Sequence, residues 1–449
     1  MANSYLARTP SSTGNRKTFT FSAWVKRSKL LDNYPIMFKQ VTDASNFVQF
    51  YFDNQDHLAF YVENGSGSGY SSLQITNRKF RDVSAWYHVM VAVDTTQASA
   101  DNRVKIYVNG NQETSFSTNT QINQNIDVAA INTTGLIEIG RASNNSSQHF
   151  NGYMTHVSLV DGQQLAPTVF GQTDSTSGIW KFKSPSGVTW GTNGFHLKFE
   201  NSGNLGLDSS GNTNNFTVNG NLKQALDTPS NVSCTFNPLS TKVIGTVGFS
   251  LDNGATVLNP SSNTNQFAMG TLAASAGKWY WEMKSTSSSG NDWPDIGFMF
   301  ADKVSTHMAA TGNPQHNFSY AAAIEANGTR WAFGTQTTSW FGGFSSNAII
   351  MCAVDVTAGK LWWGVDGAWL NSGDPANGTN AGATFTAGTS ITPWTEQYNV
   401  GDVQANFGNG FFGTTAITSA GSNGNGSLFE YDVPSGYYAL NTKNINTYG

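Results

Sequence analysis

Apolar and polar residues alternate along many short segments of this chain. In the segment 19–25, Phe19, Phe21, Ala23 and Val25 occupy every second position. Successive side chains of a β-strand point to opposite faces of its sheet, so this spacing predicts strands that place one face in a core. Apolar stripes with helical spacing extend over no more than about two turns. The chain must therefore bury its apolar surface mainly between β-sheets.

Two-residue turn signals follow several of the alternating segments. Asn109-Gly110 ends one alternating run, and Asp366-Gly367 ends another. Both pairs favour type I′ hairpins, in which the two central residues need positive φ angles. Glycine occupies 46 positions, and charged residues make up only 12% of the chain, against about 25% in an average protein. We therefore predict an all-β fold built from antiparallel sandwiches.

The density of alternating runs divides the 449 residues into three regions. Residues 1–172 and 237–449 are rich in such runs, and each region is long enough to form a sandwich with its own core. Residues 173–236 contain many turn residues, although the alternation of Phe195 and Leu197 indicates a short strand there. We interpret this middle region as an ordered connector with short strands, and the end of the last region as a C-terminal tail.

Charge and hydrophobicity exclude several classes of function. The formal net charge is −5, which gives no positive field for holding nucleic acid. No apolar run approaches the ~20 residues of a membrane helix, and the N-terminal residues lack the apolar core of a secretion signal. Cys234 and Cys352 are too few for a disulfide framework. We expect two unpaired thiols in strands, with a single disulfide between them as the alternative.

Seven segments of the first region occur in the order and spacing of a known family. They are FTFSAWV (19–25), WYHV (86–89), VD (93–94), VKIYVNG (104–110), IEIG (137–140), FNGYM (150–154) and VDGQQL (160–165). This set resembles laminin-G-like domains, which are concanavalin A-like jelly rolls. Members of that family often carry acidic residues just after the closing glycine, where this chain has Thr155 and His156.

The last region carries a second set of motifs. They are GKWYWE (277–282), IGF (296–298), IIMCAVD (349–355), LWWGVDG (361–367) and NFG (406–408). These motifs resemble those of SPRY domains, which are also concanavalin-like sandwiches. The two resemblances together imply two concanavalin A-like antiparallel β-sandwiches, or jelly rolls, joined by a short β-containing connector.

The connector and the tail resemble segments of structural proteins from tailed bacteriophages. The connector segments are GLDSSGN (206–212), DTPSN (227–231) and NPL (237–239), and the tail segment is VPSGYYALNT (433–442). The resemblance implies a fibre, appendage or capsid-surface protein, made in the host cytoplasm without a signal peptide and located on the virion surface. It also implies capsid or tail proteins as partners, and a homo-oligomer, with a trimer expected by analogy with fibres.

A glycan-degrading enzyme is one alternative, because concanavalin-like folds include glycoside hydrolases. Such enzymes need two carboxylates, which the hydrolases of this architecture carry in a Glu-x-Asp-x-x-Glu strand motif that this sequence lacks. We expect Glu282 to face solvent, and Asp292 and Asp295 to be solvated loop residues. His88 is expected to be a packed strand residue. We therefore predict a protein without enzymatic activity.

Binding of host-surface polysaccharide is the function we expect. Aromatic rings pack on the C–H faces of sugars, while amide groups bond their hydroxyls. The candidate ligand-binding residues, all in loops rich in small polar residues, are Trp293, Trp340, Phe341, Trp369 and Asn371. The alternative for these rings is that they cap the sandwich ends or contact a neighbouring subunit. In that case the protein would be a purely structural decoration or cement protein of the particle.

Calcium is the only metal that the laminin-G resemblance brings into question, and no other cofactor is expected. Members of this class hold Ca²⁺ at one rim with Asp, Asn and backbone oxygens. The candidates here are Asp94, Asp101 and Asp161, which lie near expected loop ends. Aspartates in turns are also common without any metal.

A cluster of basic residues near the N-terminus suggests a docking face for an acidic virion partner. The candidates are Arg8, Arg16, Lys17, Lys26, Arg27 and Lys29. Lysines that protect an exposed edge strand from aggregation would explain the same cluster.

Overall fold

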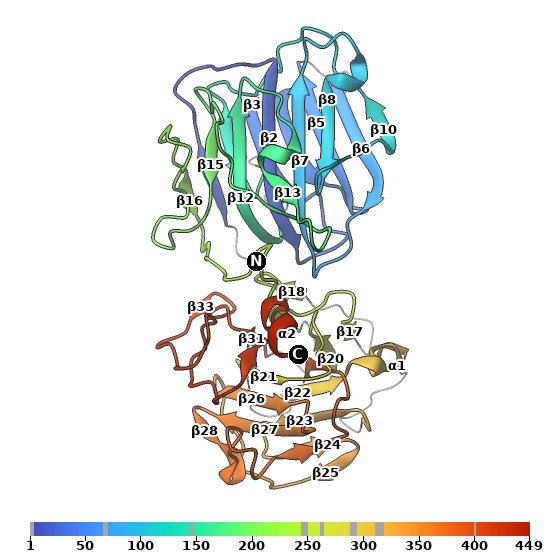
Figure 1. The fold of residues 1–449 in the computed structure, drawn as a ribbon, viewed down its shortest axis with the longest axis vertical. Coiled ribbons are helices and arrows are strands. Elements are labelled where there is room, and N and C mark those ends of the chain that lie inside the picture. The colour runs from blue at the N-terminus through green and yellow to red at the C-terminus, as the bar shows by residue number, and fades with distance from the viewer. Residues whose placement is uncertain are drawn as a thin grey trace. The chain divides into compact units, whose positions relative to one another are not determined.

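The computed structural model describes residues 4–65, 71–142, 148–243, 250–260, 265–287, 294–309, 318–398 and 401–449. The chain is divided into two compact units, Met1–Gln224 and Ala225–Gly449 (Figure 1). The division falls inside the segment 173–236, most of whose strands pair within the first unit. The fold is all-β, with antiparallel sheets in both units, as the alternation predicts.

The first unit consists of two antiparallel sheets. The larger sheet contains, in spatial order, β10 (Phe116–Thr120), β6 (Ser72–Lys79), β5 (His57–Asn64), β4 (Asn46–Phe52), β3 (Ile36–Asp43), β11 (Leu136–Ile139), β1 (Tyr5–Arg8) and β16 (Thr217–Asn219). The smaller sheet contains β15 (Phe195–Leu197), β12 (Gly152–Asp161), β2 (Thr18–Arg27), β7 (Trp86–Asp94), β8 (Val104–Val108) and β9 (Asn111–Gln112).

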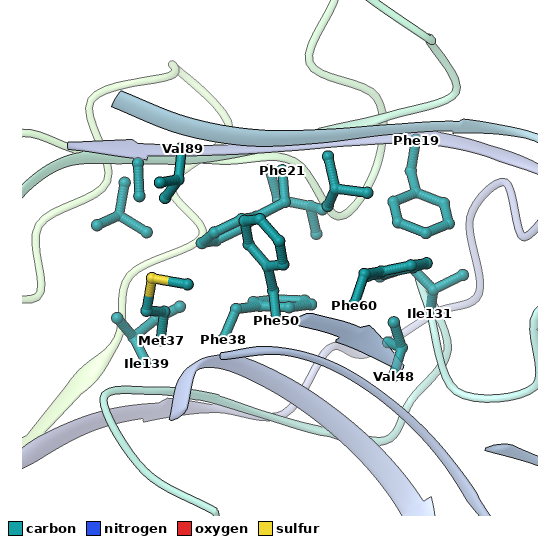
Figure 2. Packing of buried hydrophobic residues seen from close by; sticks show 14 of the residues in the cluster. Phe19, Phe21, Met37, Phe38, Val48, Phe50, Phe60, Val89, Ile131 and Ile139 are labelled. Carbon is teal, nitrogen blue, oxygen red and sulfur yellow. The ribbon is translucent and has the colours of Figure 1, made fainter. Parts of the chain in front are cut away.

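The facing sides of these two sheets form the core of the first unit. Phe19, Phe21, Ala23 and Val25 are fully buried on one face of β2, which confirms the predicted alternation. Figure 2 shows the rings of Phe19 and Phe21 pointing toward aromatic rings of the larger sheet, such as Phe38. The ring centroids of Phe21 and Phe38 lie 4.7 Å apart.

The other face of the smaller sheet is covered as well, by the segment 165–190. This segment contains a hairpin of β13 (Gly171–Thr173) and β14 (Trp180–Phe182). Phe170 and Trp190 pack against Met90 and Val160 of the sheet. Both faces of β2 are therefore buried. The alternation in β2 shows which side chains lie on the same face, but neither face is exposed to solvent.

The second unit also contains two large sheets. One contains β17 (Lys242–Val243), β20 (Gln266–Met269), β30 (Ile391–Gln397), β22 (Asp295–Phe300), β23 (Ala321–Glu325), β24 (Arg330–Ala332) and β25 (Thr335–Thr337). The other contains β18 (Ser250–Asp252), β19 (Val257–Asn259), β31 (Val403–Asn406), β21 (Lys278–Ser285), β26 (Ile349–Asp355), β27 (Lys360–Val365) and β28 (Ala368–Trp369), with β29 (Ala383–Thr384) and β34 (Tyr438–Ala439) at its sides. The remaining elements are β32 (Phe411–Phe412), β33 (Thr415–Ala416), α1 (Val304–Ala309) and α2 (Thr442–Tyr448).

Buried tryptophans dominate the core of the second unit. Trp279 and Trp281 of β21 and Trp363 of β27 are buried between the sheets. On the opposite side of the same strands, Tyr280 and Trp362 pack under the C-terminal segment 429–439. This sheet, like the smaller sheet of the first unit, is covered on both faces by the chain itself.

The predicted hairpin turns are confirmed. Asn109 and Gly110 have φ angles of 48° and 81°, and Asp366 and Gly367 have angles of 48° and 87°. The residues that flank each turn are paired in register. In the described residues, no helix is long and apolar enough to cross a membrane.

Both cysteine side chains are buried, and no disulfide joins them. Burial raises the pKa of the Cys352 thiol well above its usual range. A thiol with a raised pKa is a poor nucleophile, because the thiolate is the reactive form. The thiol of Cys352 therefore serves as a small apolar group in the core.

Candidate functional site

The loop that follows β25 carries Trp340 and Phe341. Both residues donate their backbone N–H groups to the carbonyl oxygen of Gly328, at 2.9 and 3.3 Å. Gly328 has a φ of 87°, and a Cβ atom there would lie 2.4 Å from the carbonyl oxygen of Phe341. Gly343, on the other side of the loop, has a φ of 81°. Glycine at these two positions lets the loop close tightly and fixes where the two rings lie.

The ring of Trp340 is partly exposed and packs at one end of the sandwich. It meets the buried ring of Trp363 edge-on, with centroids 5.9 Å apart at 77°. A Cβ atom on Gly382 would lie 3.1 Å from Trp340, so glycine is needed for this packing. The guanidinium carbon of Arg330 lies 5.2 Å from the centroid of the Trp340 ring, within the range of a cation–π contact.

Asn371 joins this cluster from a different loop. It follows β28 in a left-handed conformation, with φ 53° and ψ 40°. Its side-chain N–H donates to the backbone oxygen of Trp340 at 3.0 Å, and the residue is exposed. The structure thus brings together Trp340, Phe341 and Asn371, which the sequence named as separate candidates. Arg330 is the member of this cluster that the sequence analysis missed.

The other two predicted aromatics lie elsewhere. The ring of Trp369 contacts Tyr280 at 6.5 Å and belongs to the cluster under the C-terminal segment. It therefore packs in a different cluster from Trp340, although only one residue separates it from Asn371 in the sequence. Trp293 lies outside the described residues.

The Trp340 cluster has the groups that a sugar site needs. It combines a partly exposed aromatic ring and an exposed amide, from two loops, with a cation from β24. A ring of this kind can pack on the C–H face of a sugar while the polar groups bond hydroxyls or charged substituents. Trp340 and Phe341 also pack against the core, so the same rings close the end of the sandwich.

Glu282 was expected to face solvent, and this expectation is wrong. Its side chain is fully buried on β21 under the C-terminal segment. One carboxylate oxygen accepts the Tyr280 hydroxyl and the Tyr431 backbone N–H, each at 2.9 Å. The other accepts the N–H of Glu430, also at 2.9 Å. Glu282 thus fixes the C-terminal segment to the sheet.

The buried environment of Glu282 predicts a pH-dependent stability of the second unit. Burial raises the pKa of Glu282 to about 7, against the effect of the two backbone N–H groups. The unfolded value is about 4.3, so the stabilising contribution of this group is full below pH 4 and falls by about 3 kcal/mol as the pH rises to 7. Glu282→Gln should flatten the pH dependence of the second unit's unfolding temperature between pH 5 and 8.

Thermal unfolding at four pH values checks this prediction. Glu200→Gln is the matched control, because the side chain of Glu200 is 69% exposed. That variant should follow the wild-type profile. A Glu282→Gln protein with an unchanged profile would show that another group titrates.

Three further carboxylates lie side by side in the other sheet of the second unit. Asp295 of β22 is paired in register with Glu325 of β23 and with Glu396 of β30. Cross-strand partners share a face, and all three side chains are buried. The expectation that Asp295 is a solvated loop residue is therefore wrong, and Asp292 lies outside the described residues.

The sequence hid this carboxylate row because its members come from three strands that are spread over about a hundred positions. The indole N–H of Trp331 donates to Glu325 at 2.7 Å, and the amide of Asn265 donates to Glu396. A glycosidase places its carboxylates on either side of a bound sugar. These carboxylates instead contact protein groups in a buried setting.

The environment of His88 opposes a role in nucleophilic catalysis. Its Nε2 lies 2.8 Å from the hydroxyl of Ser22, and its Nδ1 accepts the indole N–H of Trp180 at 3.1 Å. An indole N–H can only donate, so Nδ1 carries no proton and Nε2–H donates to Ser22. A base that activates a serine must accept a proton at that nitrogen. The prediction that His88 is a packed strand residue is confirmed by its complete burial.

The three calcium candidates do not form a metal site. Both carboxylate oxygens of Asp161 accept backbone N–H groups, from Asn15 at 2.7 Å and from Asn193 at 3.0 Å. Asp94 accepts the groups of its own turn, including the Thr96 hydroxyl at 2.6 Å. Asp101 is exposed in a short 3₁₀ turn. The described residues hold no group of three His, Cys, Asp or Glu side chains that could bind a metal ion, and the oxygens of Asp161 and Asp94 accept hydrogen bonds from protein groups. These aspartates therefore do not fit a calcium ion.

The basic candidates near the N-terminus have different environments. Arg27 is buried and pairs with Asp56 at 2.9 Å, and Lys26 is also buried. Lys17 and Lys29 keep 41% and 43% of their side chains exposed. The charge of Arg27 is therefore used inside the unit, whereas Lys17 and Lys29 keep part of their side chains exposed.

The remaining two basic candidates contact the body of the first unit. Arg8 donates to the side chain of Asn214, and Arg16 donates to the backbone oxygen of Val128 at 3.1 Å. Both side chains are partly buried, so they tie surface segments together. A docking role for the basic cluster stays a prediction.

Comparison with known proteins supports the fold of the first unit. A family profile described as the concanavalin A-like lectin/glucanases superfamily (Laminin_G_3) matches residues 2–169. No curated protein matches the chain. The profile covers the region where the sequence resembles laminin-G-like domains.

Solved structures show partial likenesses. The SPRY domain of human HERC1 is 16% identical, with 38% of this chain and 96% of that chain covered and a TM-score of 0.29. The TRIM65 PSpry domain is 14% identical, with coverages of 38% and 89% and a TM-score of 0.28. A native heptameric SAP-like pentraxin from Limulus polyphemus is 14% identical, with coverages of 42% and 82% and a TM-score of 0.30. Residues 2–169 therefore match a concanavalin A-like family profile, and the structure itself shows an all-β chain whose two units each contain two large antiparallel sheets.

Proposed function

We propose that this protein is a non-catalytic, carbohydrate-binding component of a bacteriophage particle surface. Its ligand is a host-surface polysaccharide, bound through the cluster of Trp340, Phe341 and Asn371. The observation that carries the proposal is the juxtaposition of a partly exposed tryptophan, on a loop closed by Gly328 and Gly343, with an exposed amide on a second loop. The lectin-type domain of the first unit supports the same class of function.

The particle location rests on the resemblance of the connector and tail segments to tailed-phage structural proteins. In this role the protein is synthesised in the host cytoplasm and assembles with capsid or tail proteins. We propose several copies per particle, arranged as a homo-oligomer, with a trimer by analogy with fibres. Weak single sites then act together, because tethered copies raise the effective concentration at a surface.

A binding assay with purified host-envelope polysaccharide tests this function. Trp340→Ala should reduce the affinity at least about fivefold, because removal of a buried or stacked aromatic anchor costs about 1–4 kcal/mol in typical interfaces. Trp369→Ala is the control, since it removes another partly buried tryptophan of the same unit from a different cluster. It should leave the affinity unchanged. Binding is measured by calorimetry, and folding of each variant by its unfolding temperature.

Release of reducing sugar ends is measured in the same samples. Binding without release supports the proposal. If reducing ends are released, and if Asp295→Asn or Glu396→Gln abolishes this release, the depolymerase alternative is established. The buried carboxylate row is the structural observation that favours this alternative. Absence of both signals would overturn the proposal in favour of a structural decoration or cement protein.

A further inference from the structure

Arg330 distinguishes the Trp340 cluster from a simple aromatic cap. It is the only arginine among residues 225–449 of the sequence. Its Nη1 donates to the backbone oxygen of Gly382 at 2.7 Å, and its Nη2 donates to the Thr337 hydroxyl at 2.9 Å. Both acceptors are neutral. The guanidinium has five N–H donors, so these two bonds leave donors of a fixed, planar fork available.

No carboxylate of the described residues compensates the charge of Arg330. Burial lowers the pKa of Arg330, and no acidic group acts against this shift. In the first unit, by contrast, Arg27 and Arg81 pair with Asp56, and Arg141 pairs with Glu138. A partly buried cation without an anionic partner costs free energy, and an anion supplied by a ligand recovers it.

We infer that the ligand of the Trp340 cluster is an acidic glycan whose carboxylate pairs with Arg330. This inference rests on the proposed function and names the chemical class of its ligand. The sugar ring packs on the exposed part of Trp340, and the amide of Asn371 bonds a hydroxyl. The carboxylate accepts from the fork of Arg330, which is already oriented by Gly382 and Thr337.

The charge of the second unit narrows this class further. Residues 225–449 contain seven basic and fourteen acidic residues, which gives a formal charge of −7. Such a unit repels densely charged anionic polymers over a distance of about 8 Å, the Debye length at physiological salt. A polysaccharide whose repeat unit carries one carboxylate, for example on a uronic acid residue, therefore fits better than a heavily sulfated polysaccharide.

The test begins with a printed array of bacterial glycans that contains both neutral and carboxylated members. Bound glycans are then titrated by calorimetry, each in its native form and after chemical reduction of its carboxylates to alcohols. We expect wild-type protein to bind the native form at least about tenfold more tightly, the gain typical of a hydrogen bond to a charged group. Arg330→Gln should bind the two forms equally, and Arg330→Lys should keep part of the preference.

Control variants separate loss of charge recognition from loss of structure. Lys443→Gln removes an exposed cation of the same unit, on α2, and should keep the preference for the native form. The unfolding temperature of Arg330→Gln shows whether that variant is folded. If it is not folded, the preference of Arg330→Lys for the native glycan is compared with that of the wild-type protein instead. Equal binding of native and reduced glycans by wild-type protein would overturn the acidic-ligand inference while the proposed function stands. Absence of any bound glycan would overturn the proposed function itself.

Discussion

Acidification from pH 7.5 to pH 5 is expected to destabilise the first unit by roughly 6 kcal/mol, or about 2 kcal/mol for each of three histidines. His88, His156 and His196 are held in the neutral form by burial, which lowers their pKa values to about 3, 3 and 4. A typical domain has a total stability of about 5–15 kcal/mol. The expected loss is therefore large enough to unfold the unit or leave it marginally stable.

The geometry of His88 explains why it resists protonation. Its Nδ1 accepts the Trp180 indole N–H at 3.1 Å, so a proton on this nitrogen would place two donors against each other. The ring is stacked between Trp24, at 5.2 Å, and Trp180, at 6.0 Å. No charged group acts on its pKa, and burial alone lowers it.

His156 and His196 form a pair that needs a single shared proton. Nδ1 of His156 lies 3.2 Å from Nε2 of His196, so one nitrogen must donate and the other accept. The ring of Phe182 stacks on His156 with centroids 3.5 Å apart. Burial lowers both pKa values first, the cation of Lys198 lowers both further, and Asp208 raises that of His196.

The direction and the pH window follow from these shifts. An unfolded histidine has a pKa of about 6.5, so at pH 5 the unfolded chain binds protons that the folded unit does not. The stabilising contribution is therefore full above pH 6.5 and is lost as the pH falls toward 4. Because the pKa values of all three histidines in the folded unit lie below 5, the loss of stability at pH 5 depends mainly on the pKa of histidine in the unfolded chain.

Differential scanning calorimetry at pH 7.5, 6 and 5 measures this effect on the full chain. His156→Asn keeps a residue type that tolerates the φ of 49° at this position, and it should reduce the acid-induced loss by about 2 kcal/mol. Thr155→Ala is the control, because it changes the neighbouring position of β12 without removing a titratable group, and it should leave the loss unchanged. An unchanged acid response in His156→Asn would show that other groups carry the effect.

Asp56→Asn is expected to cost the first unit about 3–5 kcal/mol, the range for removal of one partner of a buried ion pair. Asp56 is fully buried and accepts Nη2 of Arg27 at 2.9 Å, Nε of Arg81 at 2.8 Å and the N–H of Leu31 at 2.7 Å. Asparagine keeps the shape of the side chain and tolerates the φ of 73°. The substitution removes the charge and replaces one accepting oxygen with an NH₂ group that can only donate, so Arg27 loses its paired carboxylate and one donor of Arg27, Arg81 or Leu31 loses its acceptor.

Arg81→Ala provides the matched control for this substitution. Arg81 pairs with the same carboxylate, but 46% of its side chain is exposed, whereas 1% of that of Arg27 is exposed. Exposed pairs contribute about 0–1 kcal/mol, so Arg81→Ala should lower stability by no more than that amount. Urea unfolding at pH 7.5 compares the two variants. If Asp56→Asn costs no more than Arg81→Ala, the buried pair is not the main contributor.

Local sequence patterns predicted the strands because alternation depends only on neighbouring residues. Phe19 and Phe21 share the core face of β2, and Asn109-Gly110 forms the expected turn, since these features are determined within a few residues. The same patterns could not show that both faces of β2 are buried. The segment that covers its second face, residues 165–190, lies more than a hundred positions later.

The candidate site was predictable in part for the same reason. Composition identified Trp340 and Asn371 as loop residues of the right chemistry, but only tertiary structure places the amide of one on the backbone of the other. Arg330 carried no local signal, because a single arginine next to a tryptophan in a strand is ordinary. Glu282 was misassigned, since its burial depends on a segment about 150 residues away.

The double coverage of the sheets has an evolutionary consequence. In each unit, the chain's own later segment covers the outer face of one large sheet, as the packing of Trp180 on His88 and of Phe429 on Tyr280 illustrates. Substitutions on either face of these sheets are therefore expected to disturb packing. We expect exposed loop positions, such as Asn371, to tolerate change more readily. A lineage built on this scaffold can therefore diversify what it recognises while its framework stays almost constant.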